Sequence, residues 1–214
     1  MNVVETSLQG CLLIEPKVFR DDRGLFLEVY RKDAYAVAGM EADFVQDNHS
    51  RSAKGVLRGI HFQDMSAPMA KLVRCTAGRI FDVAVDLRTG SPQFGRWFGV
   101  ELSADNMKQL YVPVGFGHAF LALSETADLQ YKCSAYWAPA AERVLAWNDP
   151  ELAIDWPVRQ PILSPRDQKG ESLKEYRERP AFRDPHPDPP HKGEGNRDPL
   201  PDPPHRGEGN REGR

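Results

Sequence analysis

The sequence predicts an all-β fold of the sandwich or barrel type. Many short segments alternate apolar with polar residues and are rich in β-branched and aromatic side chains. Turns rich in Gly, Pro, Asp and Asn separate these segments at a spacing of about ten residues, which is typical of sandwiches and barrels. A convincing helical pattern occurs at residues 171–179, near the end of the apolar part of the chain. We therefore expect strands to dominate, with a few short helices.

Composition divides the chain into a folded body, residues 1–182, and a tail, residues 183–214. The body is long enough for one domain with a hydrophobic core. In the tail the one large apolar residue is Leu200, and the motif RDPHPDPPHKGEGN returns almost unchanged as RDPLPDPPHRGEGN. Such a segment cannot bury enough apolar surface to offset its ordering entropy, so we predict disorder. This composition leaves open whether the tail is translated repetitive DNA or a segment that binds a partner.

The strands of the body can be placed by their alternation. The clearest is residues 80–88, in which Phe81 and Val83 share one face and Asp82 and Ala84 the other. A short helix is expected at 33–38, capped by Asp33. The remaining expected strands lie at residues 12–19, where Pro16 interrupts the run, and at 25–31, 44–50, 97–102, 118–123, 129–136 and 144–147.

The stretch at residues 55–74, GVLRGIHFQDMSAPMAKLVR, is the centre around which the body is organised. Its pattern predicts two strands joined by a loop at 64–70. We expect these strands to be neighbours in one sheet, which would place His61, a candidate base, beside Lys71, a candidate cation. A second glycine-rich motif with a histidine, PVGFGH, follows at residues 113–118.

Charge and cysteine content exclude several classes of protein. The formal net charge of −3 argues against a general nucleic-acid binder. Three well-separated cysteines form no CxxC pair, and Cys75 and Cys133 lie in apolar runs, so we expect buried free thiols in a reducing compartment. We detect neither a run long enough for a membrane helix nor a signal peptide, and therefore expect a cytoplasmic protein.

Four side chains suit proton abstraction next to a carbonyl group. A base such as His61 removes the α-proton, the ammonium of Lys71 stabilises the enolate oxygen, and Tyr131 returns a proton from the opposite face. Asp167 can hold the far imidazole nitrogen, which fixes the tautomer and raises the basicity of the ring. Inversion of a stereocentre requires groups on opposite faces, and a His/Tyr pair meets that need.

Taken singly, these residues also fit ordinary structural roles. A histidine on a strand, such as His61, is usually a satisfied polar group, and Lys71 fits an exposed strand lysine. Tyr131 alternates with apolar neighbours and therefore fits core packing. Arg23 and Arg58 fit surface ion pairs. The function of each residue thus depends on the order and context of the motifs around it.

Two of the motifs resemble the signatures of the cupin superfamily, whose fold is a double-stranded β-helix or jelly roll. They are G(x)5H at residues 55–61 and PxGxxH at residues 113–118. In metal-binding cupins the first motif continues as HxH, whereas here the sequence is His61-Phe62-Gln63. Two remaining histidines make a weak set of ligands, so we expect no metal. A metal-dependent cupin enzyme remains a rival interpretation.

A set of motifs in one order resembles the dTDP-4-dehydrorhamnose 3,5-epimerase family over roughly residues 5–175. The resemblance implies a cupin-type jelly roll that works without metal or coenzyme, epimerising C3 and C5 of dTDP-4-dehydro-6-deoxy-D-glucose. It also implies a homodimer and a dTDP-sugar substrate. The motifs are RGIHFQ, KLVR, DVAVDLR, SPQFGRW, LYVPVGFGHAF, YK followed by YWAP, WNDP, IDWP and LSPRD.

The resemblance assigns a role to each matching residue. His61 matches the proton acceptor, Tyr131 the proton donor, Asp167 the partner of the histidine and Lys71 the residue that stabilises the enolate. Trp137 matches an aromatic that stacks on the thymine, a position where the family often has Tyr. The positions implied to bind substrate are Arg23, Glu28, Gln46, Asp47, Asn48, Arg58, His118, Trp137, Glu142 and Arg166.

The implied roles of the arginines raise two structural expectations. Arg23 and Arg58 would hold the diphosphate, where guanidinium groups suit phosphate oxygens. Arg23 and Glu28 would reach the site of a neighbouring subunit. Ideal alternation puts Arg58 and His61 on opposite faces of their strand, although both are assigned to the ligand. Gly59 lies between them, and a glycine bulge there could re-aim one of the two side chains.

Two further functions stay open beside the double epimerisation. One is epimerisation at C3 or C5 alone, on the way to a different deoxysugar. The other is a catalytically silent module that binds a sugar nucleotide. Deuterium exchange at the two carbons separates all three.

Overall fold

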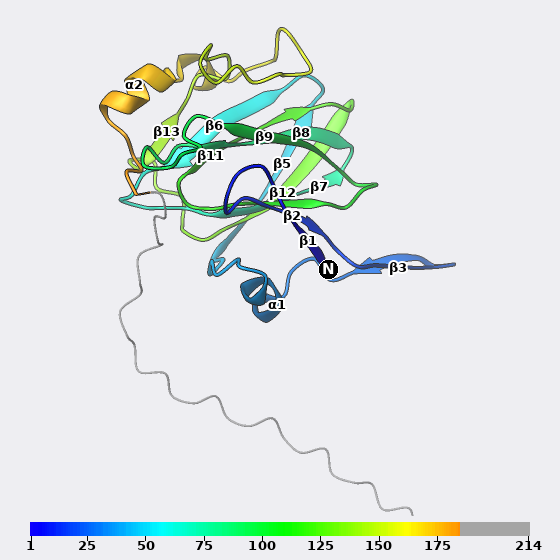
Figure 1. Ribbon diagram of the computed structural model, residues 1–214. Helices are drawn as coiled ribbons and strands as arrows, with labels where there is room; N and C mark the ends of the chain where they lie inside the picture. Colours follow the sequence, from blue (N-terminus) through cyan, green and yellow to red (C-terminus); the bar gives the residue numbers. More distant parts are fainter. Residues whose placement is uncertain (185–214) are drawn as a thin grey trace, which may run out of the picture.

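Two antiparallel sheets face each other in the computed structural model, which describes residues 1–184 (Figure 1). This arrangement is the cupin-type jelly roll that the sequence predicts. The six-stranded sheet has the order β1 (Asn2–Glu5), β2 (Leu12–Glu15), β10 (Gln109–Val112), β7 (Lys71–Ala77), β12 (Thr126–Cys133) and β5 (Gln46–Ala53). The five-stranded sheet has the order β13 (Glu142–Val144), β6 (Leu57–Gln63), β11 (Phe116–Ala122), β8 (Arg79–Asp86) and β9 (Trp97–Ser103).

The two central strands do not lie side by side as the sequence analysis expected. β6 belongs to the five-stranded sheet and β7 to the six-stranded sheet, so the loop at residues 64–70 crosses between the sheets. The prediction of one shared sheet for His61 and Lys71 was therefore wrong. The two side chains instead come from opposite walls of the sandwich.

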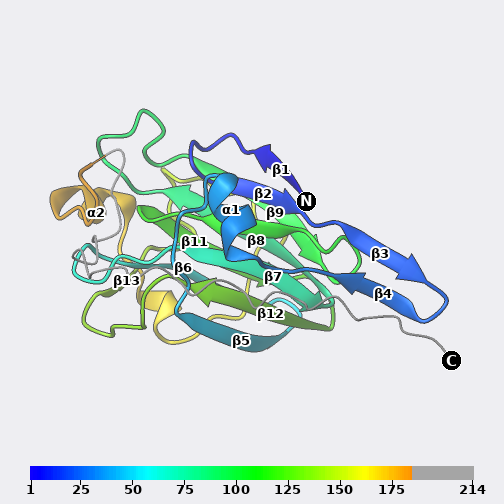
Figure 2. The same ribbon diagram turned by 90° about the horizontal axis from the view of Figure 1, so that it is seen from below.

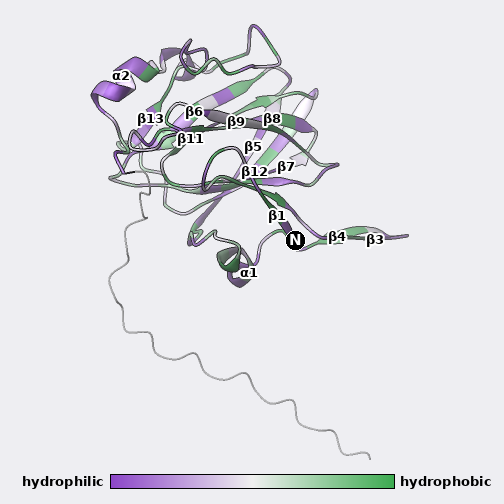
Figure 3. Cartoon of the chain, viewed as in Figure 1, coloured by the Kyte–Doolittle hydropathy of each residue, from purple (hydrophilic) through white to green (hydrophobic). Residues whose placement is uncertain are grey.

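The pattern of β8 shows how alternation builds the sandwich. Val83 and Val85 are fully buried on the outer side, where the C-terminal segments cover the sheet, whereas Ala84 faces the other sheet. Hydrophobic and hydrophilic residues accordingly occur together along strands of both sheets (Figure 3). The polar face of this strand is thus the inward one, which brings Asp82 into the interior.

An apolar core fills most of the space between the sheets. Val73, Leu110 and Leu129 of the six-stranded sheet pack in one cluster with Ile80 and Phe120 of the five-stranded sheet. All five are at most 5% exposed. Because this burial removes apolar surface from water, it supplies most of the force that holds the sheets together. The core leaves one end of the sandwich open to polar side chains.

Helix α2 (Leu173–Glu178) covers the outer side of the five-stranded sheet. Its start is fixed by a capping box, in which Ser172 and Glu175 exchange hydrogen bonds with each other's backbone N–H groups. The hydroxyl of buried Tyr176 donates to the Leu87 carbonyl at 2.7 Å, and its ring lies 5.6 Å from that of Phe62. The helix thereby supports the back of β6.

Helix α1 (Lys32–Val37) lies against the six-stranded sheet and begins earlier than expected. Its N-cap is Arg31 rather than Asp33, and no side chain caps it. The Asp33 carboxylate instead accepts a hydrogen bond from the Ala34 N–H at 2.8 Å, inside the first turn. The predicted cap was therefore wrong. Buried Tyr35 anchors the helix by donating to the Val29 carbonyl at 2.9 Å.

A separate hairpin of β3 (Val18–Asp21) and β4 (Gly24–Leu27) projects from the body (Figure 2). It carries two large apolar side chains that face solvent, since Phe19 is 51% and Phe26 is 70% exposed. Arg23 lies at the turn. An apolar surface of this kind on a projecting arm is typical of an interaction site.

The bulge that the sequence analysis expected at Gly59 is confirmed. His118 pairs with His61 while Phe120 pairs with Arg58, so β6 has one residue more than β11 over this interval. Gly59 has φ of 123°, and a Cβ there would lie 2.5 Å from the Ala119 Cβ. Only glycine fits this position, and the extra residue turns Arg58 and His61 to the same face.

Within residues 1–184 the structure contains no helix long and apolar enough to cross a membrane. The predicted disordered tail lies outside the described residues from 185 onward, and the predicted boundary at residue 182 remains a prediction.

Candidate active site

The inner face of the five-stranded sheet carries a row of polar side chains. His61 of β6 pairs with His118 of β11, and residues that pair across an antiparallel ladder point to the same face. Arg58 joins this face because of the bulge at Gly59. One wall of the sandwich interior therefore presents two imidazoles and a guanidinium.

His61 is held by a buried carboxylate. Its Nε2 lies 2.5 Å from Oδ1 of Asp167, whose side chain is 3% exposed. Asp167 begins the short 3-10 helix η1 (Asp167–Lys169), and Ser164 donates to its other oxygen at 2.8 Å. This is the one hydrogen bond that the described residues give the imidazole, so Nδ1 is available to a substrate. Ser164 belongs to the LSPRD motif, but its role as a second partner of Asp167 was not predicted.

The pKa values of this pair favour a neutral imidazole beside an ionised carboxylate. Burial lowers the pKa of His61, and the Asp167 hydrogen bond only partly opposes that effect. Burial alone would raise the pKa of Asp167, but hydrogen bonds from His61 and Ser164 bring it below its usual value. At neutral pH His61 can therefore accept a proton while Asp167 stabilises the resulting imidazolium.

The opposite wall carries Lys71 and Tyr131. Tyr131 of β12 pairs with Val73 of β7, and Lys71 pairs with Cys133, so all four point into the sandwich. The Lys71 Nζ lies 6.0 Å from the centre of the Tyr131 ring. The cation and the phenol are thus neighbours on the wall that faces His61.

Burial changes the acidity of both groups. It raises the pKa of Tyr131, so the phenol keeps its proton at neutral pH and can act as a donor. Burial lowers the pKa of Lys71, and the nearby thiol of Cys133 and carboxylates of Glu142 and Asp82 oppose this by favouring the ammonium form. Among the described residues no carboxylate lies within 4 Å of the Lys71 ammonium, because Asp167, Asp82 and Glu142 pair with other side chains. The ammonium can therefore interact with a ligand.

His118 forms a second histidine–aspartate pair. Its Nε2 lies 3.0 Å from Oδ2 of Asp82, and the two residues are 6% and 0% exposed. Asp82 comes from the inward polar face of β8. The hydrogen bond to Asp82 therefore fixes the orientation of the predicted site residue His118.

Strand β5 divides its predicted residues between two faces. Gln46 pairs with Cys133 and Asn48 with Tyr131, so both point inward. Asp47 points outward, where its carboxylate binds Lys132 at 2.9 Å. The structure therefore brings Gln46 and Asn48 to the interior and Asp47 to the outer surface.

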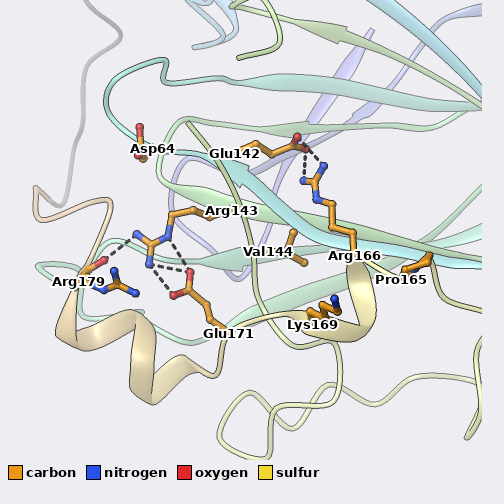
Figure 4. Close-up of a pocket in the computed structure, with 9 residues that line it drawn as sticks. All are labelled: Asp64, Glu142, Arg143, Val144, Pro165, Arg166, Lys169, Glu171 and Arg179. Carbon is orange, nitrogen blue, oxygen red and sulfur yellow. Dashed lines mark hydrogen bonds and ion pairs between the residues drawn. The ribbon is translucent and has the colours of Figure 1, made fainter. Parts of the chain in front are cut away.

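At the open end of the interior, Trp137, Glu142 and Arg166 form a hydrogen-bonded group. The Trp137 indole donates to Glu142 Oε2 at 2.6 Å, and Arg166 donates to the same oxygen at 2.8 Å. Figure 4 shows Arg166 and Glu142 facing each other on the wall of a cavity of about 860 Å³, with Arg143 and Glu171 paired nearby. Three predicted binding residues thus meet in one place.

Arg23 and Glu28 are not brought to this site within one chain. Arg23 lies at the tip of the projecting hairpin, where its side chain is 90% exposed and binds Asp21. The Glu28 carboxylate lies 3.9 Å from the Arg31 guanidinium.

Gln63 occupies the place of the second histidine of the HxH motif. Its amide donates to the carbonyls of Ala67 and Tyr136 and accepts from the Ala138 N–H at 2.7 Å. This glutamine therefore holds two loops around the site, a role that sequence reasoning missed. No group of three or more His, Cys, Asp and Glu side chains suited to a metal occurs among residues 1–184.

Together the two walls define a class of enzyme. A neutral, carboxylate-held imidazole faces a protonated phenol and an ammonium across one interior, which suits removal of a proton from one side of a carbon and its return from the other. Such a site, on a cupin-type jelly roll, suits a carbohydrate epimerase.

The comparisons identify the family. The profile of the dTDP-4-dehydrorhamnose 3,5-epimerase family matches residues 5–175, and the chain belongs to this family. A dTDP-4-dehydrorhamnose 3,5-epimerase from Pseudomonas aeruginosa is 52% identical over 81% of this chain and 96% of its own.

Two other relatives extend the comparison. The crystal structure of a 3,5-epimerase from Legionella pneumophila, in complex with dTDP-4-keto-L-rhamnose, has a TM-score of 0.78 and 47% identity. It covers 81% of this chain and 93% of its own. A dTDP-4-dehydrorhamnose 3-epimerase from Streptomyces niveus is 44% identical over 83% of this chain and 86% of its own.

Proposed function

We propose that this enzyme epimerises C3 and C5 of dTDP-4-dehydro-6-deoxy-D-glucose and yields dTDP-4-dehydro-β-L-rhamnose, for dTDP-L-rhamnose biosynthesis. The observation that carries the proposal is the opposition of two walls. His61, held by Asp167 of η1, lies on the five-stranded sheet, and Tyr131 with Lys71 lies on the six-stranded sheet. A proton can therefore leave one face of a sugar ring and return to the other.

The proposed reaction uses the acidity that the C4 ketone gives its neighbouring C–H bonds. His61 takes the proton from C3 or C5, and the electron pair moves onto the C4 oxygen as an enolate. The Lys71 ammonium stabilises that oxygen, and Tyr131 then donates a proton to the opposite face of the same carbon. The electron pair stays within the sugar, so the steps need no coenzyme. Since C3 and C5 both flank the ketone carbon, one base can serve each centre in turn.

The remaining predicted residues bind the nucleotide in this proposal. Arg58, at the same face as His61, is suited to the diphosphate, and Gln46 and Asn48 line the interior beside Tyr131. Trp137 offers an exposed ring for the thymine. His118, Glu142 and Arg166 lie around the same space.

We also propose a homodimer in which the hairpin of β3 and β4 reaches the neighbouring subunit. Its exposed Phe19 and Phe26 supply apolar contact area. Arg23 at its tip, far from the chain's own histidine, would then complete the partner's diphosphate site together with Glu28.

A cytoplasmic location is part of the proposal. The three cysteines, Cys11, Cys75 and Cys133, are free and buried, as expected from the sequence. Unpaired buried thiols are typical of proteins kept in a reducing compartment. This supports the expected location.

The test is deuterium exchange followed by NMR. Wild-type enzyme incubated with the substrate in D2O should incorporate deuterium at both C3 and C5. A Tyr131→Phe variant, which retains the base but lacks the phenolic proton, should lose product formation. Normal turnover of this variant would reject the role of Tyr131 as proton donor. A wild type that exchanges no deuterium would reject the mechanism and favour a silent binding module.

The second candidate function is epimerisation at one carbon alone. It is favoured by the 44% identity to the Streptomyces niveus protein named as a 3-epimerase. The same NMR experiment decides between the two, because deuterium at a single carbon after full conversion identifies a single-centre epimerase.

A further inference from the structure

Trp137 combines exposure with unusually firm anchoring. Trp137 is 58% exposed, yet its backbone N–H donates to the Gln46 side chain at 3.1 Å. The next N–H, of Ala138, donates at 2.7 Å to Gln63, which is 5% exposed. The indole Nε1 donates to Glu142 at 2.6 Å. Two backbone hydrogen bonds thus fix the loop that carries Trp137, and the bond from the indole restrains the ring itself.

The Glu142 carboxylate is fully engaged in this arrangement. One oxygen accepts from both the Trp137 indole and Arg166, and the other forms an ion pair with Arg166. Its side chain is 15% exposed. Burial would raise the pKa of Glu142, but hydrogen bonds from Arg166 and Trp137 bring it below its usual value, so the group is an ionised acceptor. Few acceptor positions remain for a ligand.

The backbone holds Glu142 in a defined place relative to the base. β13 pairs with β6 so that Glu142 lies opposite Gln63 and Val144 opposite His61. Both anchors of the Trp137 loop, Gln63 and Glu142, therefore face each other on one ladder, two pairs away from the pair that contains His61. The ring has a position fixed relative to His61.

We propose that Glu142 is a positioning residue, which sets the plane of the Trp137 indole as a preformed platform for the flat base of the nucleoside diphosphate. This inference rests on the proposed function. The indole N–H lies in the plane of the ring, so its bond to Glu142 restrains rotation without covering either face. A ring restrained before binding loses less rotational freedom when a base stacks on it, and the affinity is correspondingly higher.

The test is a double-mutant cycle on the full chain, with dTDP as the probe and calorimetry as the measurement. Glu142→Asp keeps the charge beside Arg166 but shortens the reach toward the indole, and Glu142→Gln removes the charge. Trp137→Phe keeps a flat face and lacks the N–H. Each Glu142 variant should weaken dTDP binding by about fivefold to tenfold, since it breaks a charge-assisted hydrogen bond. In the Trp137→Phe background the same changes should alter the dissociation constant by less than about twofold.

Steady-state kinetics add a second readout. KM of the Glu142→Asp variant should rise in step with the dTDP dissociation constant, while kcat changes much less, because the aspartate keeps the negative charge that Glu142 presents to Lys71 and His61. A fall in kcat with unchanged KM would overturn the proposal. Glu171→Gln is the matched control, because it removes a half-buried carboxylate from the same cavity wall without touching Trp137. It should leave dTDP affinity unchanged.

The outcomes separate this inference from the function on which it rests. Equal effects of the Glu142 changes in both backgrounds would overturn the positioning role while the epimerase proposal stands. A wild type that fails to bind dTDP would overturn both.

Discussion

His61 differs from an ordinary surface histidine in the balance of two opposing effects. Burial lowers its pKa and Asp167 raises it, with burial the larger effect. The reaction needs the neutral ring, so activity should fall as pH falls through the pKa of His61. The acidic limb of the kcat/KM profile should therefore lie below 6.5, the ordinary value for histidine.

Replacing Asp167 tests both roles of the carboxylate. Asp167→Asn removes the charge that raises the pKa of His61, so the acidic limb should move to still lower pH. The imidazolium formed in the reaction also loses its partner, and kcat should fall by about 10²- to 10⁴-fold. A pH profile of kcat/KM measured for both enzymes checks this, and an acidic limb that stays in place would contradict the coupling of the two groups.

The charge of Lys71 can be tested in the same way. Lys71→Met keeps the length of the side chain but removes the charge that faces the enolate, and kcat should fall by about 10²- to 10³-fold. Lys132→Met is the control, because Lys132 lies on the outer face of β12 and binds Asp47. Turnover assays should show near-normal rates for the control, and similar losses in both variants would point to a general effect of charge.

Among the elements, β6 has the most demanding backbone. Gly59→Ala would place a Cβ 2.5 Å from the Ala119 side chain and 2.6 Å from the His118 carbonyl, at a φ of 123°. Unfolding free energy should fall by about 2–5 kcal/mol, from backbone strain and overpacking together. Gly55→Ala, at φ of 80° with open space around it, should cost about 1–2 kcal/mol.

Urea unfolding of the two glycine variants measures this difference. Activity should distinguish them as well, since only the Gly59 change displaces Arg58 and His61 relative to each other. Equal stability losses would mean that the space at Gly59 relaxes easily and that the bulge does not fix the two side chains.

The same element shows what the sequence could and could not predict. Alternation conflicted with the assigned roles of Arg58 and His61, and the glycine between them suggested a bulge that could re-aim one side chain. Alternation also fixes which residues share a face of one strand, but it does not say which strand lies beside which. A loop of seven residues, 64–70, fits a wide hairpin and a crossing between sheets equally well, so the partner of β6 was mispredicted.

The site shows the same division between local pattern and tertiary context. His61, Lys71, Tyr131 and Asp167 could be selected because their motifs carry a recognisable order, and the first three meet in the interior. The supporting hydrogen bonds of Gln63 could not be foreseen, since they depend on loops that are distant in sequence. Asp47 alternates with Gln46 and Asn48, and that period alone places it on the outer face.

For the whole molecule, the main question is whether one chain makes a complete site. Arg23 lies in the turn between β3 and β4, on a hairpin that projects from the body (Figure 2). We expect an Arg23→Ala variant and a His61→Ala variant to be weakly active alone. When the two are mixed and allowed to exchange subunits, each mixed dimer should contain one intact site.

Such a mixture should recover about a quarter of the wild-type activity, because half the dimers are mixed and each has one working site. Activity measured before and after mixing checks the prediction, with light scattering to verify the dimer. An unmixed sample of either variant is the control. If mixing restores no activity, Arg23 acts within its own chain or has no part in the reaction.

Because residues 64–70 cross from one sheet to the other, substitutions in the core should affect the reaction rate. His61 and Tyr131, the proposed proton acceptor and donor, lie on separate sheets, so the apolar side chains between the sheets set the distance between them. Enlarging or shrinking Val73 or Phe120 would alter that distance without contact with the sugar. Losses of rate should therefore map to the middle of the sandwich as well as to the residues that touch the reacting carbons.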